Sequence, residues 1–164
     1  MESTPGVQEM KQFLWEELEL IVRTTENLIK KVAPDDWSYR PRENMRSLLE
    51  IAQHLVAIPS VDLLILQEGK EEEVKKLETE IAKATDADSL IRWMTEGLND
   101  LKEYMNGLSE DEFIHKKTKP FYLDHGTEQA KWLVEIVTHT MHHRSQLFTY
   151  LKQTGYEVSM FDLY

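Results

Sequence analysis

The sequence predicts an all-α protein in which a single four-helix bundle domain spans residues 1–164. Three observations lead to this prediction. Long stretches of the chain place apolar residues three and four positions apart, which is the spacing of one face of a helix. No segment alternates apolar and polar residues between turn residues, as a half-buried strand would. The chain contains only six glycines and five prolines, so few positions interrupt a long helix.

The first helix is expected near residues 5–32, with Ser3 or Thr4 as its N-cap. Its apolar positions fit a helix lying on a core: Phe13, Trp15, Leu18, Ile21, Val22, Leu28 and Ile29. Residues 33–36 end this helix, and residues 37–44 are predicted to form a loop.

The second helix, expected near residues 48–68, has a clear start. Ser47 and Glu50 form the S-x-x-E pattern of a capping box, in which each side chain accepts from the other residue's amide. Pro59 lies inside this helix and is expected to kink it. Residues 70–83 are strongly charged and are expected to form a short exposed helix.

The third helix is expected near residues 87–107. Its apolar residues alternate steps of three and four, which is typical of a bundle seam: Ile91, Met94, Leu98, Leu101, Met105 and Leu108. Residues 110–126 are predicted to form a loop. The fourth helix is expected near residues 128–154, with Thr127 as its N-cap and Gly155 just after its end.

The composition narrows the classes of function. Nineteen basic against thirty acidic residues give a net charge of −11, which repels phosphate backbones and anionic membranes, so neither nucleic acid nor a membrane is expected as a partner. The absence of cysteine excludes disulfides, thiolate metal sites and a cysteine nucleophile. No uninterrupted apolar run is longer than that of residues 63–66, which falls far short of the roughly 18 residues of a membrane span. With no apolar leader at the N-terminus, a cytoplasmic location is expected.

Six histidines are the chemically interesting residues: His54, His115, His125, His139, His142 and His143. His115 and His125 lie in the predicted loop and are expected to be surface residues. At about 100° per residue, His142 falls roughly a quarter turn outside the apolar stripe of the fourth helix, so it is expected at the rim or in solvent.

The other three histidines are candidate metal ligands. His139 and His143, four residues apart, fall on the apolar stripe of the fourth helix, and His54 shares an apolar face of the second. Around one ion with bonds near 2.1 Å, their nitrogens would lie about 3–3.5 Å apart and leave coordination positions open. Neutral imidazoles favour zinc, nickel, copper or iron over calcium or magnesium. Inward histidines can equally be core residues with hydrogen-bond partners, and helical phase alone leaves both interpretations open.

Other catalytic motifs are absent. Thr140 follows His139, so the glutamate of H-E-x-x-H is missing. Glu50 and Glu135 each precede a histidine by four residues, one more than the Glu-x-x-His of a di-iron centre. Both are instead candidates to hydrogen-bond the outer nitrogens of the ligand rings. No G-x-S-x-G, P-loop or G-x-G-x-x-G occurs.

The histidine segments resemble a known family. Residues 139–147, HTMHHRSQL, followed by Gly155, resemble the H-x-x-H-H-R-G-Q-L…L…G signature of the DinB-like (DinB/YfiT) superfamily. Residues 46–55, RSLLEIAQHL, are similar to its first histidine motif, and Asp162 resembles an aspartate common near the end of these chains. Ser145 stands where the motif usually has glycine.

The resemblance implies a four-helix bundle, often a homodimer, with a divalent metal, zinc or nickel first, on His54, His139 and His143. Some relatives depend on thiols: a maleylpyruvate isomerase uses mycothiol, and S-transferases use bacillithiol. The implied function is a metal-dependent transferase of a low-molecular-weight thiol, or a hydrolase, acting on a small electrophile, with Gln146 and Tyr150 as candidates to orient the substrate. The alternative is a non-catalytic metal-binding protein of a stress or damage response.

Overall fold

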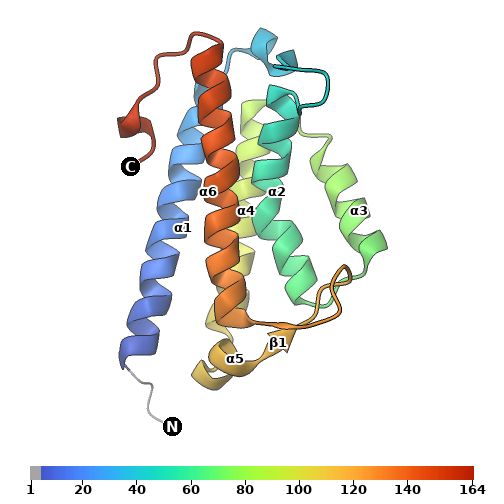
Figure 1. The fold of residues 1–164 in the computed structure, drawn as a ribbon, viewed down its shortest axis with the longest axis vertical. Coiled ribbons are helices and arrows are strands. Elements are labelled where there is room, and N and C mark those ends of the chain that lie inside the picture. Colours follow the sequence, from blue (N-terminus) through green and yellow to red (C-terminus); the bar gives the residue numbers. More distant parts are fainter. Residues whose placement is uncertain (1–4) are drawn as a thin grey trace.

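The computed structural model describes residues 5–164, and its frame is four long helices packed side by side (Figure 1). These are α1 (Pro5–Lys31), α2 (Leu48–Leu66), α4 (Ala87–Asn106) and α6 (Gln129–Gln153). The all-α four-helix prediction is confirmed, and each predicted helix end lies within two residues of the observed one. The expected caps of α1, Ser3 and Thr4, lie outside the described residues.

Each long helix packs against two others. α2 contacts α4 and α6, and α1 contacts the same two helices from the other side. Every long helix contributes fully buried leucines to the core between them: Leu18, Leu28, Leu48, Leu55, Leu90, Leu101, Leu133 and Leu151. Phe13, expected in this core, is instead 56% exposed. It lies two residues from the buried Trp15, which is about 200° around the helix, so it faces the opposite side.

The central helix α2 is the one described helix that is long and apolar enough to cross a membrane by length and composition. Most of its residues are buried inside the bundle, against α4 and α6, and this position accounts for its apolar composition. Polar residues such as Asp62 interrupt its apolar sequence, so the helix contains no long uninterrupted apolar run. The helix continues through Pro59.

Capping fixes the start of α2 and the end of α6. At the start of α2, the Glu50 amide donates to Ser47 Oγ (3.2 Å) and the Ser47 amide donates to the Glu50 carboxylate (2.7 Å), so the predicted capping box is confirmed. At the end of α6, Gly155 has a φ of +87°, and the amide of Tyr156 donates to the Leu151 carbonyl (3.0 Å). This is the left-handed C-terminal motif that favours glycine.

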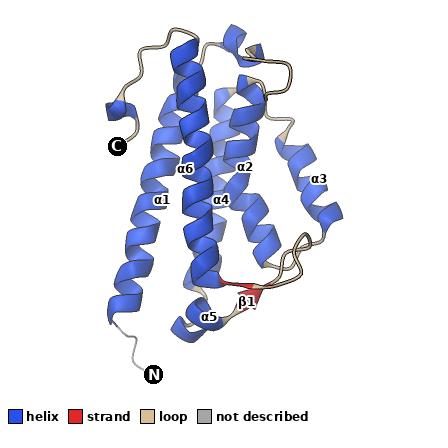
Figure 2. Ribbon diagram, viewed as in Figure 1, coloured by secondary structure: helices blue, strands red, loops and turns tan. Residues whose placement is uncertain are grey.

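The segment between α4 and α6 was predicted to be a loop, and this is wrong in part. A short helix, α5 (Glu110–His115), begins at a capping box between Ser109 and Glu112. Two short strands, β1 (Lys117–Thr118) and β2 (Thr127–Glu128), follow it and pair in antiparallel fashion (Figure 2). Because the ladder extends through Glu128, which pairs with Lys117, the helix begins one residue later than predicted and Glu128 rather than Thr127 is the N-cap of α6.

The remaining elements are short. α3 (Glu71–Ile81) is the charged helix expected there, and it packs on α2 through Val74 and Ile81. The 3-10 turn η1 (Pro34–Ser38) follows α1, and η2 (Met160–Asp162) lies near the C-terminus.

Candidate metal centre

Three histidines meet where α2 packs against α6. His54 comes from α2, and His139 and His143 come from successive turns of α6. His54 Nε2 lies 3.0 Å from His143 Nε2, and one ring nitrogen from each residue lies within 4.8 Å of the other two. The closest pair therefore has the spacing expected of shared ligands, whereas the group as a whole is more open than the expected 3–3.5 Å.

Burial keeps the imidazoles of His54 and His143 neutral. It is the largest cause that lowers the pKa of His54 to about 3, and the charges of His143, Arg46 and His139 lower it further. Burial also lowers the pKa of His143, although the hydrogen bond to Gln146 acts in the opposite direction. Near pH 7 both rings are deprotonated, and a neutral ring keeps the lone pair that a metal ligand needs.

A glutamine one turn further along α6 fixes the orientation of the His143 ring. Gln146 Oε1 lies 2.7 Å from His143 Nδ1. An amide oxygen only accepts, so Nδ1 carries the proton and the lone pair of His143 lies at Nε2, the nitrogen that approaches His54. Gln146 Nε2 lies 3.3 Å from Nε2 of His142, which is exposed and outside the three-histidine group.

An aspartate of α2 faces the third ring. Asp62 Oδ2 lies 3.9 Å from His139 Nδ1, and the Asp62 side chain is only 14% exposed. Burial raises the pKa of Asp62, and the contact with His139 lowers it. This residue was not predicted from the sequence. Its signal was a lone carboxylate inside the apolar stretch 55–66.

The glutamates expected beside the ligand rings lie elsewhere. Glu50 caps α2 and pairs with Arg40 at 2.9 Å, and Glu135 pairs with Lys131 at 2.9 Å on the exposed face of α6. Tyr150, a candidate to orient substrate, donates its hydroxyl to the Arg46 carbonyl (3.0 Å) and so anchors the turn before α2. The two glutamates were misplaced because spacing along one helix does not show which groups face each other between helices.

Two further residues of the segments that resemble the family motif have structural roles. The buried Arg144 guanidinium donates to Thr24 Oγ1 (2.9 Å) and to the Leu163 carbonyl (2.8 Å), which ties α1, α6 and the C-terminal segment together. Asp162 pairs with Lys31 at 3.3 Å. Neither residue belongs to the histidine group.

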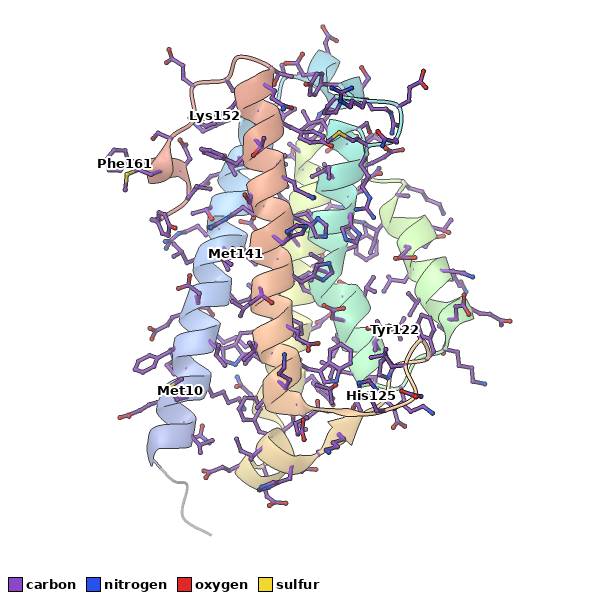
Figure 3. The ribbon with its side chains drawn as sticks, viewed as in Figure 1. Met10, Tyr122, His125, Met141, Lys152 and Phe161 are labelled. Atoms are coloured by element: carbon purple, nitrogen blue, oxygen red, sulfur yellow. The ribbon has the colours of Figure 1, made fainter. Side chains whose placement is uncertain are left out.

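The surface histidines are where they were expected. His115 and His125 are both exposed, and each lies beside an aspartate: Asp111 at 3.0 Å and Asp124 at 2.9 Å, respectively. Figure 3 shows His125 in the segment that leads into α6. His115 differs from the prediction only in ending α5 rather than lying in a loop.

The chain is similar to proteins of one family. The model of the DinB family matches residues 8–164. A solved structure from Exiguobacterium sibiricum 255-15, assigned to the DinB family, is 27% identical with a TM-score of 0.74, and the match covers 92% of this chain and 95% of that one. No curated protein matches.

Two Bacillus structures share the fold at lower identity. A DinB-like protein of Bacillus subtilis, YjoA, is 20% identical with a TM-score of 0.65, over 88% of this chain and 94% of that one. A DinB-like protein of Bacillus cereus ATCC 10987 is 16% identical with a TM-score of 0.70, over 89% and 93%.

Proposed function

Because the chain belongs to the DinB family, we propose that it binds one divalent transition-metal ion, zinc or nickel first, through His54, His139 and His143. The observation that carries this proposal is the approach of His54 Nε2 to His143 Nε2 at 3.0 Å, with a nitrogen of His139 close by. In the ion-free protein His54 Nε2–H can donate to the lone pair of His143. A metal ion replaces that single hydrogen bond by bonds to all three rings.

The donor set suits such an ion. Three imidazole nitrogens occupy three positions of a tetrahedral ion, and among residues 5–164 no fourth histidine, aspartate or glutamate joins the group. A position is then left for a small molecule. Gln146 supports this arrangement, because it fixes His143 with its lone pair toward the other rings.

We propose that the protein is a metal-dependent transferase of a low-molecular-weight thiol, or a hydrolase, that acts on a small electrophile. A bound ion would lower the pKa of a thiol or of a water and so supply the nucleophile at neutral pH. The chain's residues contribute the neutral nitrogen ligands and the apolar surroundings in which α2 and α6 hold them.

One observation favours the alternative, a non-catalytic metal-binding protein of a stress response. The cavity beside the histidines measures about 30 Å³, and a cavity of about 570 Å³ between α2 and α4 includes none of them. Pockets for drug-sized ligands usually measure roughly 300–1,000 Å³. An enzyme with this site therefore acts on a small molecule or opens the site further.

Elemental analysis of untagged protein tests metal binding, because a histidine tag would itself retain nickel. We expect about one zinc or nickel per chain. Thiol-transfer assays with several thiols and small electrophiles then separate the two functions. Metal-dependent turnover supports the enzymatic function. Full metal occupancy without turnover of any of these thiols and electrophiles supports the non-catalytic alternative.

A further inference from the structure

A small cavity adjoins the three histidines between α2, α3 and α6. His54 and His139 form one side of it, and the carboxylates of Asp62 and Glu78 form another. Three apolar side chains of α2 complete the lining. Because two of the rings line the cavity, a group bound there lies next to any ion that the three histidines hold.

The charged residues that line this cavity are all acidic. Its lining includes two carboxylates and no lysine or arginine. Asp62 is largely buried, and its one ion pair within residues 5–164 is the 3.9 Å contact with His139 Nδ1, which is too long for a hydrogen bond. A buried carboxylate is unfavourable unless donors or a cation satisfy it. The oxygens of Asp62 therefore retain the capacity to accept from a bound group.

The size of the cavity limits that group. A volume of about 30 Å³ holds one or two water-sized groups, since a single water needs roughly 10–15 Å³ on a comparable measure. An ammonium group is of this size and carries hydrogen-bond donors for a carboxylate. An aromatic ring or a trimethylammonium group is too large.

We propose that this cavity, the Asp62 subsite, binds the ammonium group of a small primary amine whose thiol or hydroxyl, two or three bonds away, occupies the open position of the metal. The inference rests on the proposed metal binding and narrows its substrate class to small aminothiols or amino alcohols. Asp62 accepts from the ammonium group within the cavity, and Glu78 adds a second carboxylate at its rim.

Thiol binding to the cobalt-loaded protein tests the Asp62 subsite. Cobalt(II) is the probe because a bound thiolate gives it a charge-transfer absorption band. Cysteamine carries the ammonium group, 2-mercaptoethanol replaces it by a hydroxyl, and thiocholine replaces it by a trimethylammonium group. The measured quantity is the ratio of the 2-mercaptoethanol Kd to the cysteamine Kd. This ratio is compared between wild type and variants. The two thiols differ in acidity and in their tendency to chelate the metal, but these differences are the same in every variant and cancel in the comparison.

We expect this ratio to fall about tenfold from wild type to Asp62→Asn, because a charge-assisted hydrogen bond is lost. The matched control is Glu9→Gln, which removes an exposed carboxylate of α1 outside the cavity and should leave the ratio unchanged. Glu78→Gln should lower the ratio by a smaller factor. Because Glu78 is exposed, this variant remains available if Asp62→Asn does not fold.

Several results would overturn the subsite. An unchanged ratio in Asp62→Asn, with cobalt still bound, rejects it and leaves the proposed metal binding intact. If thiocholine binds more tightly than 2-mercaptoethanol by the same factor as cysteamine does, the preference for a cation comes from the net charge of −11 and not from the cavity. Loss of cobalt from Asp62→Asn assigns Asp62 to holding the ion. Failure of wild type to bind cobalt, seen before any thiol is added, removes the proposed function and the subsite with it.

Discussion

His54 Nε2 and His143 Nε2 lie 3.0 Å apart across the interface between α2 and α6. The two residues are separated by 89 positions in the sequence, and each is carried by a helix that is buried along most of one face. The core of the bundle therefore sets the distance between the two nitrogens, and the rings need no flexible loop to meet.

The stability of the metal-free protein should depend on pH through His54. Its pKa is about 3 in the folded protein and near 6.5 when unfolded, so below pH 6.5 the unfolded chain binds a proton that the folded chain does not. The free energy of unfolding should therefore fall as the pH drops from 6.5 toward 3. His54→Gln should lose less stability between pH 7 and pH 5 than wild type, as measured by urea unfolding with a chelator present. His125→Gln, at an exposed histidine, is the control. If His54→Gln loses as much stability between pH 7 and pH 5 as wild type does, His54 is not the source of the pH dependence.

Gln146 should control metal affinity without touching the ion. Gln146→Leu leaves the proton of His143 Nδ1 without an acceptor, so the ring is no longer fixed in the tautomer that ligates through Nε2. We expect a loss of about 10–100-fold in zinc affinity, measured by competition with a chromophoric chelator. Gln146→Glu keeps an acceptor oxygen and should stay close to wild type. Equal affinities for Gln146→Leu and wild type would show that the hydrogen bond has no such role.

Gly97 should be needed for the close packing of α4 on α2. A Cβ atom at this position would lie 2.3 Å from Ser60 Oγ and 3.1 Å from the Ser60 backbone nitrogen, so in Gly97→Ala the Ser60 side chain must rotate and α2 must move slightly away from α4. We expect a loss of about 1–3 kcal/mol in the free energy of unfolding. Gly6→Ala is the matched control, because a Cβ there meets nothing within 4 Å, and it should be neutral or stabilising. Equal stability of the two variants would place the helices further apart than described.

We propose that the protein is a homodimer, as the family resemblance implies. Large apolar side chains are exposed on α1 and near the C-terminus, among them Phe13 (56%) and Phe161 (85%). Figure 3 shows Met10 and Phe161 along the same edge of the bundle, with Tyr122 at the opposite edge. Light scattering at tens of micromolar should give twice 19.3 kDa, and Phe13→Asp should shift the mass toward the monomer. Phe121→Asp, in the segment that carries Tyr122, is the control, and a monomeric wild type would contradict the proposal.

The parts of the fold predicted from the sequence are those with local causes. The Ser47–Glu50 capping box and Gly155 fix helix ends through residues a few positions apart, and both were found. The shift of the α6 cap from Thr127 to Glu128 depends on pairing with Thr118, which no local pattern records. The short helix α5 carries its own capping box at Ser109 and was missed because six residues show little helical periodicity.

The candidate site divides in the same way. Helical phase brought His139 and His143 to one face, and the same reasoning placed His54 opposite them. Asp62, which lies near His139 Nδ1, was not predicted, because it reaches the ring from another helix. Gln146, considered only as a candidate to orient substrate, instead fixes the His143 ring. Such contacts depend on how two helices are rotated against each other, which the spacing within one helix leaves open.

Metal binding by His143→Ala and His142→Ala tests the central claim most directly. The two residues are adjacent, but His143 belongs to the three-histidine group whereas His142 is exposed and outside it. Isothermal titration of zinc into untagged, metal-free protein should give one site per chain in wild type and in His142→Ala. In His143→Ala tight binding should be lost while the far-ultraviolet circular dichroism keeps its helical form, because the apolar seam carries the fold. One zinc per chain bound by His143→Ala with unchanged affinity would show that the three histidines are not the metal site.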